Sequence, residues 1–120
     1  EREWRMINYH KKLVSTLKTI LPTYYEMLLN RDVEVPCISY MELGNSAAET
    51  GDTLGYSIIQ YQIKVWSNKI DDLQTYAAQI DNKLRPLGWK RVGCNEMFDR
   101  ESTMMQKIMT YEANALEVFE

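Results

Sequence analysis

Few side chains in this sequence have the types and spacing that catalysis or metal binding requires. His10 is the one histidine, and no cysteine or carboxylate stands near it at the spacing of a metal-ligand set. Cys37 and Cys94 are the two cysteines, and a catalytic dyad would need one of them to meet His10 in space. We expect His10 to be solvated or partly packed. Both thiols are expected to be free and buried, although a small enzyme that uses His10 or Cys94 stays an alternative.

The closely spaced carboxylates have simpler explanations than acid–base catalysis. Asp71 and Asp72 fall in the first turn of an expected helix, where the helix dipole favours anions. Asp99 and Glu101 fall in a polar turn. The glycines form no phosphate-binding motif. The sequence therefore predicts no catalytic, cofactor-binding or metal-binding residues, and a protein that is not an enzyme.

The densest basic cluster surrounds Trp89. Cations mixed with an aromatic residue are typical of nucleic-acid-binding surfaces, but a helix C-terminus also favours lysine and arginine. The formal charge is −3, from 14 Lys and Arg against 17 Asp and Glu, which opposes tight binding to a phosphate backbone. We favour the structural explanation for these four residues, Lys83, Arg85, Lys90 and Arg91.

Hydrophobic periodicity predicts two main helices. Trp4 to Leu21 carries apolar residues at three-, four- and seven-residue steps, and Pro22 ends the pattern. The second helix is expected after a cap at Ser67 or Asn68. Its apolar residues alternate at three- and four-residue steps from Ile70 to Leu87.

The clearest strand runs from Tyr56 to Trp66. Apolar residues alternate with Gln60, Gln62 and Lys64, so one face should pack on helices and the other should be polar. The remaining strands are expected at residues 33–41, 89–94 and 104–112, with a short extended piece at 23–25.

These elements predict a single α+β domain over residues 1–120. The order is α-(β)-β-β-α-β-β, with an antiparallel or mixed sheet of about four strands and both helices on one face. Residues 44–55 are expected to form a long flexible loop, 95–102 a polar connection and 113–120 a C-terminal tail. No apolar run approaches the roughly 18 residues of a membrane helix, so we expect no membrane partner.

The order of three passages resembles the tail terminator, or tail completion, proteins of long-tailed siphovirus-type bacteriophages, especially those of Gram-positive hosts. The likeness extends over roughly residues 13–112, and Thr23 stands where many relatives have valine. The passages are a proline–tyrosine stretch and proline-led strand (21–26 and 36–40), a central strand that ends in tryptophan (51–57 and 61–66), and a helix with its following strand (80–84 and 87–91).

The resemblance implies a structural virion protein without catalysis. It implies a homo-oligomeric ring, usually a hexamer, at the head-proximal end of the tail, in the neck of a particle assembled in the host cytoplasm. The ring would stop polymerisation of the major tail tube protein and join the tail to a head-completion, or stopper, protein. Genome DNA would pass through the lumen without a specific binding site. Another neck ring, a minor tail protein or an assembly module outside phages stays an alternative.

The ring hypothesis identifies candidate lumen and interface residues. Six copies would carry 6 × (−3) = −18 formal charges, which would reduce sticking of DNA if they lined the lumen. The polar side of the Tyr56 to Trp66 strand could supply the wall, and an aromatic side chain near the C-terminus could dock on a neighbour. The candidates are Gln60, Gln62, Lys64, Glu49, Asp52 and Phe119.

Overall fold

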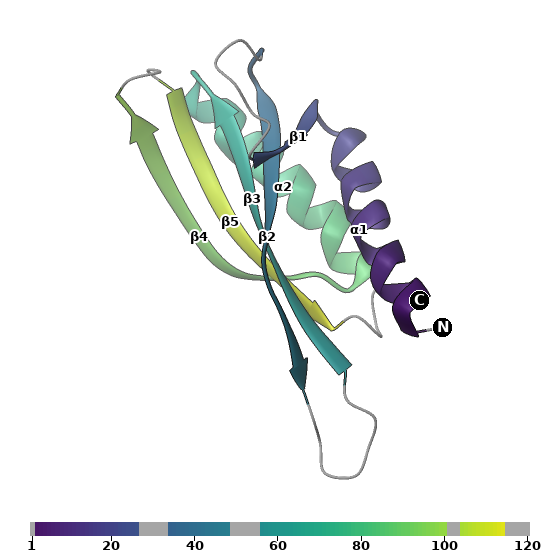
Figure 1. Ribbon diagram of the computed structural model, residues 1–120. Helices are drawn as coiled ribbons and strands as arrows, with labels where there is room; N and C mark the ends of the chain where they lie inside the picture. The colour runs from purple at the N-terminus through teal and green to yellow at the C-terminus, as the bar shows by residue number, and fades with distance from the viewer. Residues whose placement is uncertain (1, 27–33, 49–55, 101–103, 115–120) are drawn as a thin grey trace.

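The computed structural model of this chain describes residues 2–26, 34–48, 56–100 and 104–114. Within these ranges, two helices lie against one face of a mixed five-stranded sheet (Figure 1). The α+β class is confirmed, although the sheet has five strands where about four were expected. The elements are α1 (Arg2–Lys18), β1 (Thr23–Tyr25), β2 (Cys37–Ala48), β3 (Tyr56–Ser67), α2 (Ile70–Leu84), the 3-10 turn η2 (Arg85–Leu87), β4 (Lys90–Asp99) and β5 (Met104–Asn114).

The strands lie in the order β1-β2-β3-β5-β4. β1 runs parallel to β2, and the other neighbouring pairs are antiparallel. β1 pairs only with residues Ile38 to Tyr40 of β2, so the rest of β2 forms one edge of the sheet. β4 forms the other edge, because among the described strands only β5 pairs with it.

The hydrophobic core lies between the helices and the sheet. Ile59, Ile63 and Val65 of β3 are 0% exposed, so the predicted alternation of this strand is confirmed. α2 contributes the buried stripe that its spacing predicted. The core consists of Leu13, Leu17, Ile38, Ile59, Tyr61, Ile63, Val65, Leu73, Ala77, Ile80, Leu84, Trp89, Met109, Tyr111 and Ala113.

Both helices begin or end differently from the sequence prediction. α1 ends at Lys18 rather than Leu21, because the next residues turn more tightly: the amide of Thr19 donates to the carbonyl of Thr16 at 3.1 Å. The N-cap of α2 is Lys69, without a side-chain capping bond, so the predicted cap at Ser67 or Asn68 is wrong. Ser67 stands just before the helix, where its hydroxyl donates to Asp72 at 2.8 Å.

Two strands extend into segments that were expected to be loops. Residues 44–48 belong to β2, because they pair in antiparallel register with 56–60 of β3, so the expected loop at 44–55 is wrong for this half. Residues 95–99 belong to β4, paired with β5, rather than to a connection. β5 also includes Ala113 and Asn114 of the expected tail. The expectations for residues 49–55 and 115–120 lie outside the described residues.

Each edge strand contains one bulge. In β2, Leu43 lies between Glu42 and Gly44, whose partners in β3 are adjacent residues. In β4, Val92 lies between Arg91 and Gly93, again opposite adjacent residues of β5. An extra residue in one strand interrupts its ladder and leaves a side chain off the regular alternation. Leu43 and Val92 are accordingly 43% and 48% exposed.

No helix within the described ranges is both long and apolar enough to cross a membrane.

Candidate assembly surfaces

The predicted polar face of β3 is on the side of the sheet opposite the helices. Gln60, Gln62 and Lys64 alternate with the buried core residues of the strand and are themselves half-buried. The neighbouring strand adds Glu112, whose Oε1 accepts a hydrogen bond from Nε2 of Gln60 at 2.9 Å. The register aligns these side chains across β3 and β5, so the face is a continuous polar surface.

Lys64 takes part in a compact polar network at one end of this face. Nε1 of Trp66 donates to Oγ of Ser39 at 2.9 Å, and the Ser39 hydroxyl donates to Oε1 of Glu26 at 2.9 Å. Nζ of Lys64 lies 3.4 Å from the same carboxylate oxygen and 5.6 Å from the centroid of the Trp66 ring. Ser39 is fully buried. The network therefore ties β2, β3 and the residue after β1 together, and it neutralises the charge of Lys64 locally.

The two cysteines have different environments and are both free. Cys37 is buried, as expected, and burial together with the nearby charge of Glu26 raises the pKa of its thiol to about 11. Cys94 is exposed on the edge strand β4, so the expectation that both thiols are buried is wrong for Cys94. An edge strand covers only one side of its residues, which explains the exposure.

His10 is partly packed, as the sequence predicted. Its Nδ1 lies 2.6 Å from the hydroxyl of Tyr61, and its ring makes an edge contact with Tyr40 at a centroid distance of 5.8 Å. Neither cysteine contacts His10 in these interactions. No group of three or more His, Cys, Asp or Glu side chains that could hold a metal ion occurs in the part of the chain that the structure describes.

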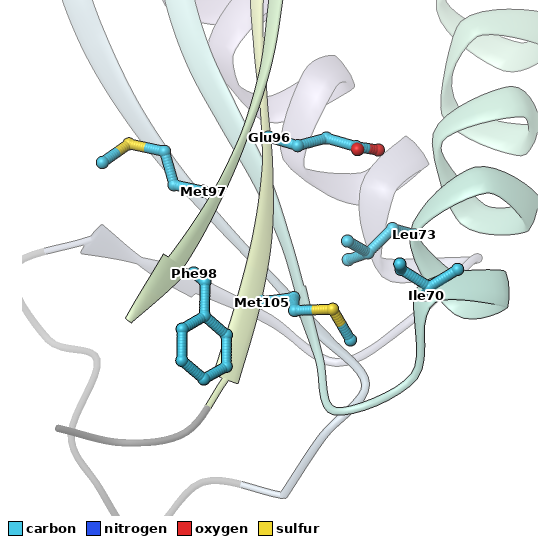
Figure 2. A pocket seen from close by; sticks show the side chains of 6 residues that line it. All are labelled: Ile70, Leu73, Glu96, Met97, Phe98 and Met105. Carbon is cyan, nitrogen blue, oxygen red and sulfur yellow. The ribbon is translucent and has the colours of Figure 1, made fainter. Parts of the chain in front are cut away.

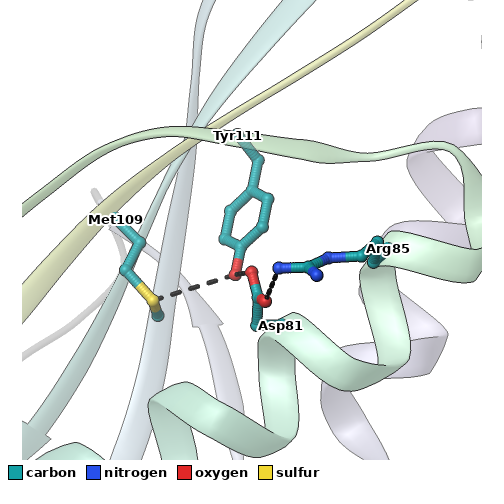
Figure 3. Close-up of polar contacts among 4 residues, drawn as sticks. All are labelled: Asp81, Arg85, Met109 and Tyr111. Carbon is teal, nitrogen blue, oxygen red and sulfur yellow. Dashed lines mark hydrogen bonds and ion pairs between the residues drawn. The ribbon is translucent and has the colours of Figure 1, made fainter.

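Asp81 connects α2 to the sheet (Figure 3). Its Oδ1 accepts a hydrogen bond from the hydroxyl of Tyr111 at 3.0 Å, and its Oδ2 forms an ion pair with Arg85 one turn later. Burial, and then the charge of Asp81, raise the pKa of Tyr111 well above its ordinary value. The same carboxylate explains much of the predicted basic cluster, because it holds Arg85. Lys83 donates to Oγ1 of Thr19 at 2.9 Å.

A shallow apolar depression of about 220 Å³ lies where the start of α2 meets the end of the β4–β5 hairpin. Figure 2 shows Met105 reaching toward Ile70 and Leu73 of α2, while Met97 points to the other side of the strand. Ile70 and Phe98 are each 59% exposed. Sequence reasoning missed this surface, because it expected residues 95–102 to be a polar connection. The Met97-Phe98 pair was the available indication.

The remaining predicted residues cannot be compared with the structure. Glu49, Asp52 and Phe119 lie outside the described residues, so the structure brings together only Gln60, Gln62 and Lys64.

No protein-family model matches this chain, and no curated protein matches it. Among solved structures, the fold is similar to a chain of the virion of a native gene transfer agent particle. The TM-score is 0.58 at 11% sequence identity, and the match covers 85% of this chain and 82% of that chain. At this identity, the likeness shows a shared fold.

Proposed function

We propose that this chain is a structural subunit of a phage-type virion, acting as a tail terminator in the neck. A homohexameric ring would close the head-proximal end of the tail, stop polymerisation of the major tail tube protein and join the tail to a head-completion protein. The observation that carries the proposal is the fold shared with a gene transfer agent virion chain over 85% of this chain. The sequence resemblance described above supports the same position in a particle.

The polar face of the sheet supports a role as the wall of a channel. Helices cover one face only, and Gln60, Gln62 and Lys64 lie on the other. Amides present both donors and acceptors without net charge, and Glu26 offsets the charge of Lys64. Such a wall attracts the DNA backbone weakly, which suits a channel that must let a genome pass. Assembly would take place in the host cytoplasm, with no enzymatic step.

Electron microscopy and mass photometry of the purified chain test the ring. We expect closed rings with a central hole and a mass of six subunits. A protein that stays monomeric at high concentration, and that forms no ring on added tail tubes, would contradict the proposal.

The place in the neck is tested by adding rings to separated tails and heads. A tail terminator binds the head-proximal end of tubes and stops their growth in a polymerisation assay. Binding to heads alone, with tube growth unaffected, would indicate a head-closure ring instead.

The channel wall is tested by charge substitution. Gln60→Lys with Gln62→Lys is expected to make assembled rings retain DNA at low salt and release it as salt rises. Gln79→Lys, on the exposed side of α2, is the matched control and should retain no more DNA than the wild type. Equal retention by both variants would place the polar face outside the lumen.

A further inference from the structure

The two edges of the sheet present unpaired backbone groups. The outer side of β4 has no strand neighbour among the described residues, and neither has β2 beyond Tyr40. Unpaired edges of this kind pair readily with another chain unless charge, proline or a bulge prevents it. Neither edge contains proline in its described strand.

The bulges decide which part of each edge can pair regularly. The bulge at Val92 leaves residues 93–99 of β4 as a regular run. The bulge at Leu43 leaves residues 44–48 of β2 as a regular run with a free side. These runs lie at opposite ends of the sheet: Gly44 is level with Gln60 of β3. Met97 is level with Trp66, through Gln106 of β5.

The strand directions allow the two runs to meet only in a displaced arrangement. β4 is antiparallel to β2, so a second copy could continue the same sheet in an antiparallel ladder. Pairing all five residues of 44–48 within 93–99 requires a displacement of at least six residues, roughly 20 Å at about 3.3 Å per residue.

The same displacement removes a steric obstacle. β1 covers Ile38 to Tyr40 on the free side of β2, and it would collide with β4 of the first copy if the two sheets were level. After a shift of six residues, Tyr40 of the second copy lies just beyond the level of Asp99, where β4 ends. The smallest shift that pairs the whole run is thus also sufficient to clear β1.

A symmetric pairing of β4 with itself is less favourable. An antiparallel self-pair of 93–99 about its middle residue sets Glu96 opposite Glu96 of the other copy, and like charges directly opposite destabilise a ladder. Residues 44–48 are uncharged and small. A side chain at Gly44 would meet nothing within 4 Å. The β2 run can therefore accept the larger Met97 and Phe98 of a neighbour.

We infer that copies of this chain join edge to edge, with residues 93–99 of β4 pairing antiparallel with residues 44–48 of β2 in the next copy. The inference rests on the proposed ring and names its contact. The contact is heterologous, so it repeats around a ring rather than ending at a dimer. Because each copy is displaced along its strands, the strands of a closed ring tilt relative to its axis.

Disulfide scanning uses the exposed thiol that the chain already has on β4. Cys94 stays in place, and Asn45→Cys, Ser46→Cys and Ala47→Cys are made one at a time. Directly opposed residues in an antiparallel ladder have Cα atoms about 4.5 to 5.5 Å apart, within disulfide range. Neighbouring positions alternate in face, so a strong and a weak position in succession report a strand pairing. Ser15→Cys on the exposed side of α1 is the control.

The expected result under mild oxidation is a ladder of covalent species beyond the dimer for at least one β2 variant. Reductant, or Cys94→Ser, should abolish the ladder, and Ser15→Cys should give none. A covalent dimer of the wild type through Cys94 would overturn the inference in favour of symmetric pairing. Visible rings without a ladder at any of the three positions would overturn the inference while leaving the proposed function standing. A monomer by mass photometry would overturn both.

Discussion

Nδ1 of His10 lies 2.6 Å from the hydroxyl of Tyr61, and this contact joins α1 to the central strand β3 across 51 positions of sequence. Tyr61 is 2% exposed and also packs edge-on against Trp89 at a centroid distance of 5.7 Å. The single histidine of the chain thus serves the attachment of a helix to the sheet.

Removing that hydroxyl should weaken the attachment of α1. Tyr61→Phe keeps the ring in the core but leaves the half-buried His10 without this partner, so we expect a loss of about 1–2 kcal/mol in the free energy of unfolding. Urea denaturation measures the loss. Tyr76→Phe, at a half-buried tyrosine that packs against the same core, is the control and should cost under about 0.5 kcal/mol. Equal losses would mean that the hydrogen bond contributes nothing specific.

Ser39→Ala should be more costly than its small change in volume suggests. The Ser39 hydroxyl is fully buried and bonds to both Glu26 and Trp66, so its removal leaves a carboxylate and an indole N–H without that partner. We expect a loss of about 1–3 kcal/mol by chemical denaturation. Ser15→Ala, whose hydroxyl donates to the Lys12 carbonyl on an exposed helix surface, should change stability by under about 0.5 kcal/mol. A neutral Ser39→Ala variant would contradict the structural role of the network.

Stability should fall as the pH rises above 10, partly through Tyr111. The folded protein raises the pKa of Tyr111 above the ordinary value of 10.0, so its contribution is complete below pH 10. Above this pH the unfolded chain releases the proton and the folded chain retains it, which favours unfolding. Tyr111→Phe should be less stable at pH 8, because the bond to Asp81 is lost, but its stability should decline less steeply between pH 9.5 and 11. Parallel declines in urea titrations would refute the assignment.

Thiol reagents should distinguish the two cysteines. At pH 8 we expect one fast-reacting thiol per native chain, Cys94, because Cys37 is buried and its pKa is raised to about 11. Both thiols should react in urea. Cys94→Ser should remove the fast reaction and leave one thiol that reacts on unfolding. Fast modification of Cys37 in the native chain would contradict its burial.

The elements with a strong periodic pattern could be predicted from sequence, and those defined by pairing could not. The alternation from Ser57 to Val65 and the apolar stripe of α2 each reflect one face against one core, so local pattern was sufficient. Residues 44–48 read as a loop, because Gly, Asn, Ser and Ala have low strand propensity. They form a strand because the well-defined β3 provides an antiparallel partner.

The candidate surfaces divide in the same way. The polar side of β3 followed from alternation, and the structure places Gln60, Gln62 and Lys64 on one face. The Glu26–Ser39–Trp66 network joins residues up to 40 positions apart, a proximity that no spacing rule contains. The bulges at Leu43 and Val92 depend on the register of neighbouring strands, so they too were beyond reach of the sequence.

The central position of the β3–β5 pair also has a consequence for the order of folding. Its partners are separated by 38 residues at Ser67 and Met105 and by 56 residues at Ile58 and Asn114, whereas β2 with β3 and β4 with β5 are neighbours along the chain. Local hairpins form within about microseconds, and closing the long loops between them is slower. The two hairpins therefore form before the centre of the sheet is joined. A nascent chain passes through a stage in which β3 and β5 are edges as well, and that stage is the one most exposed to misassembly between chains.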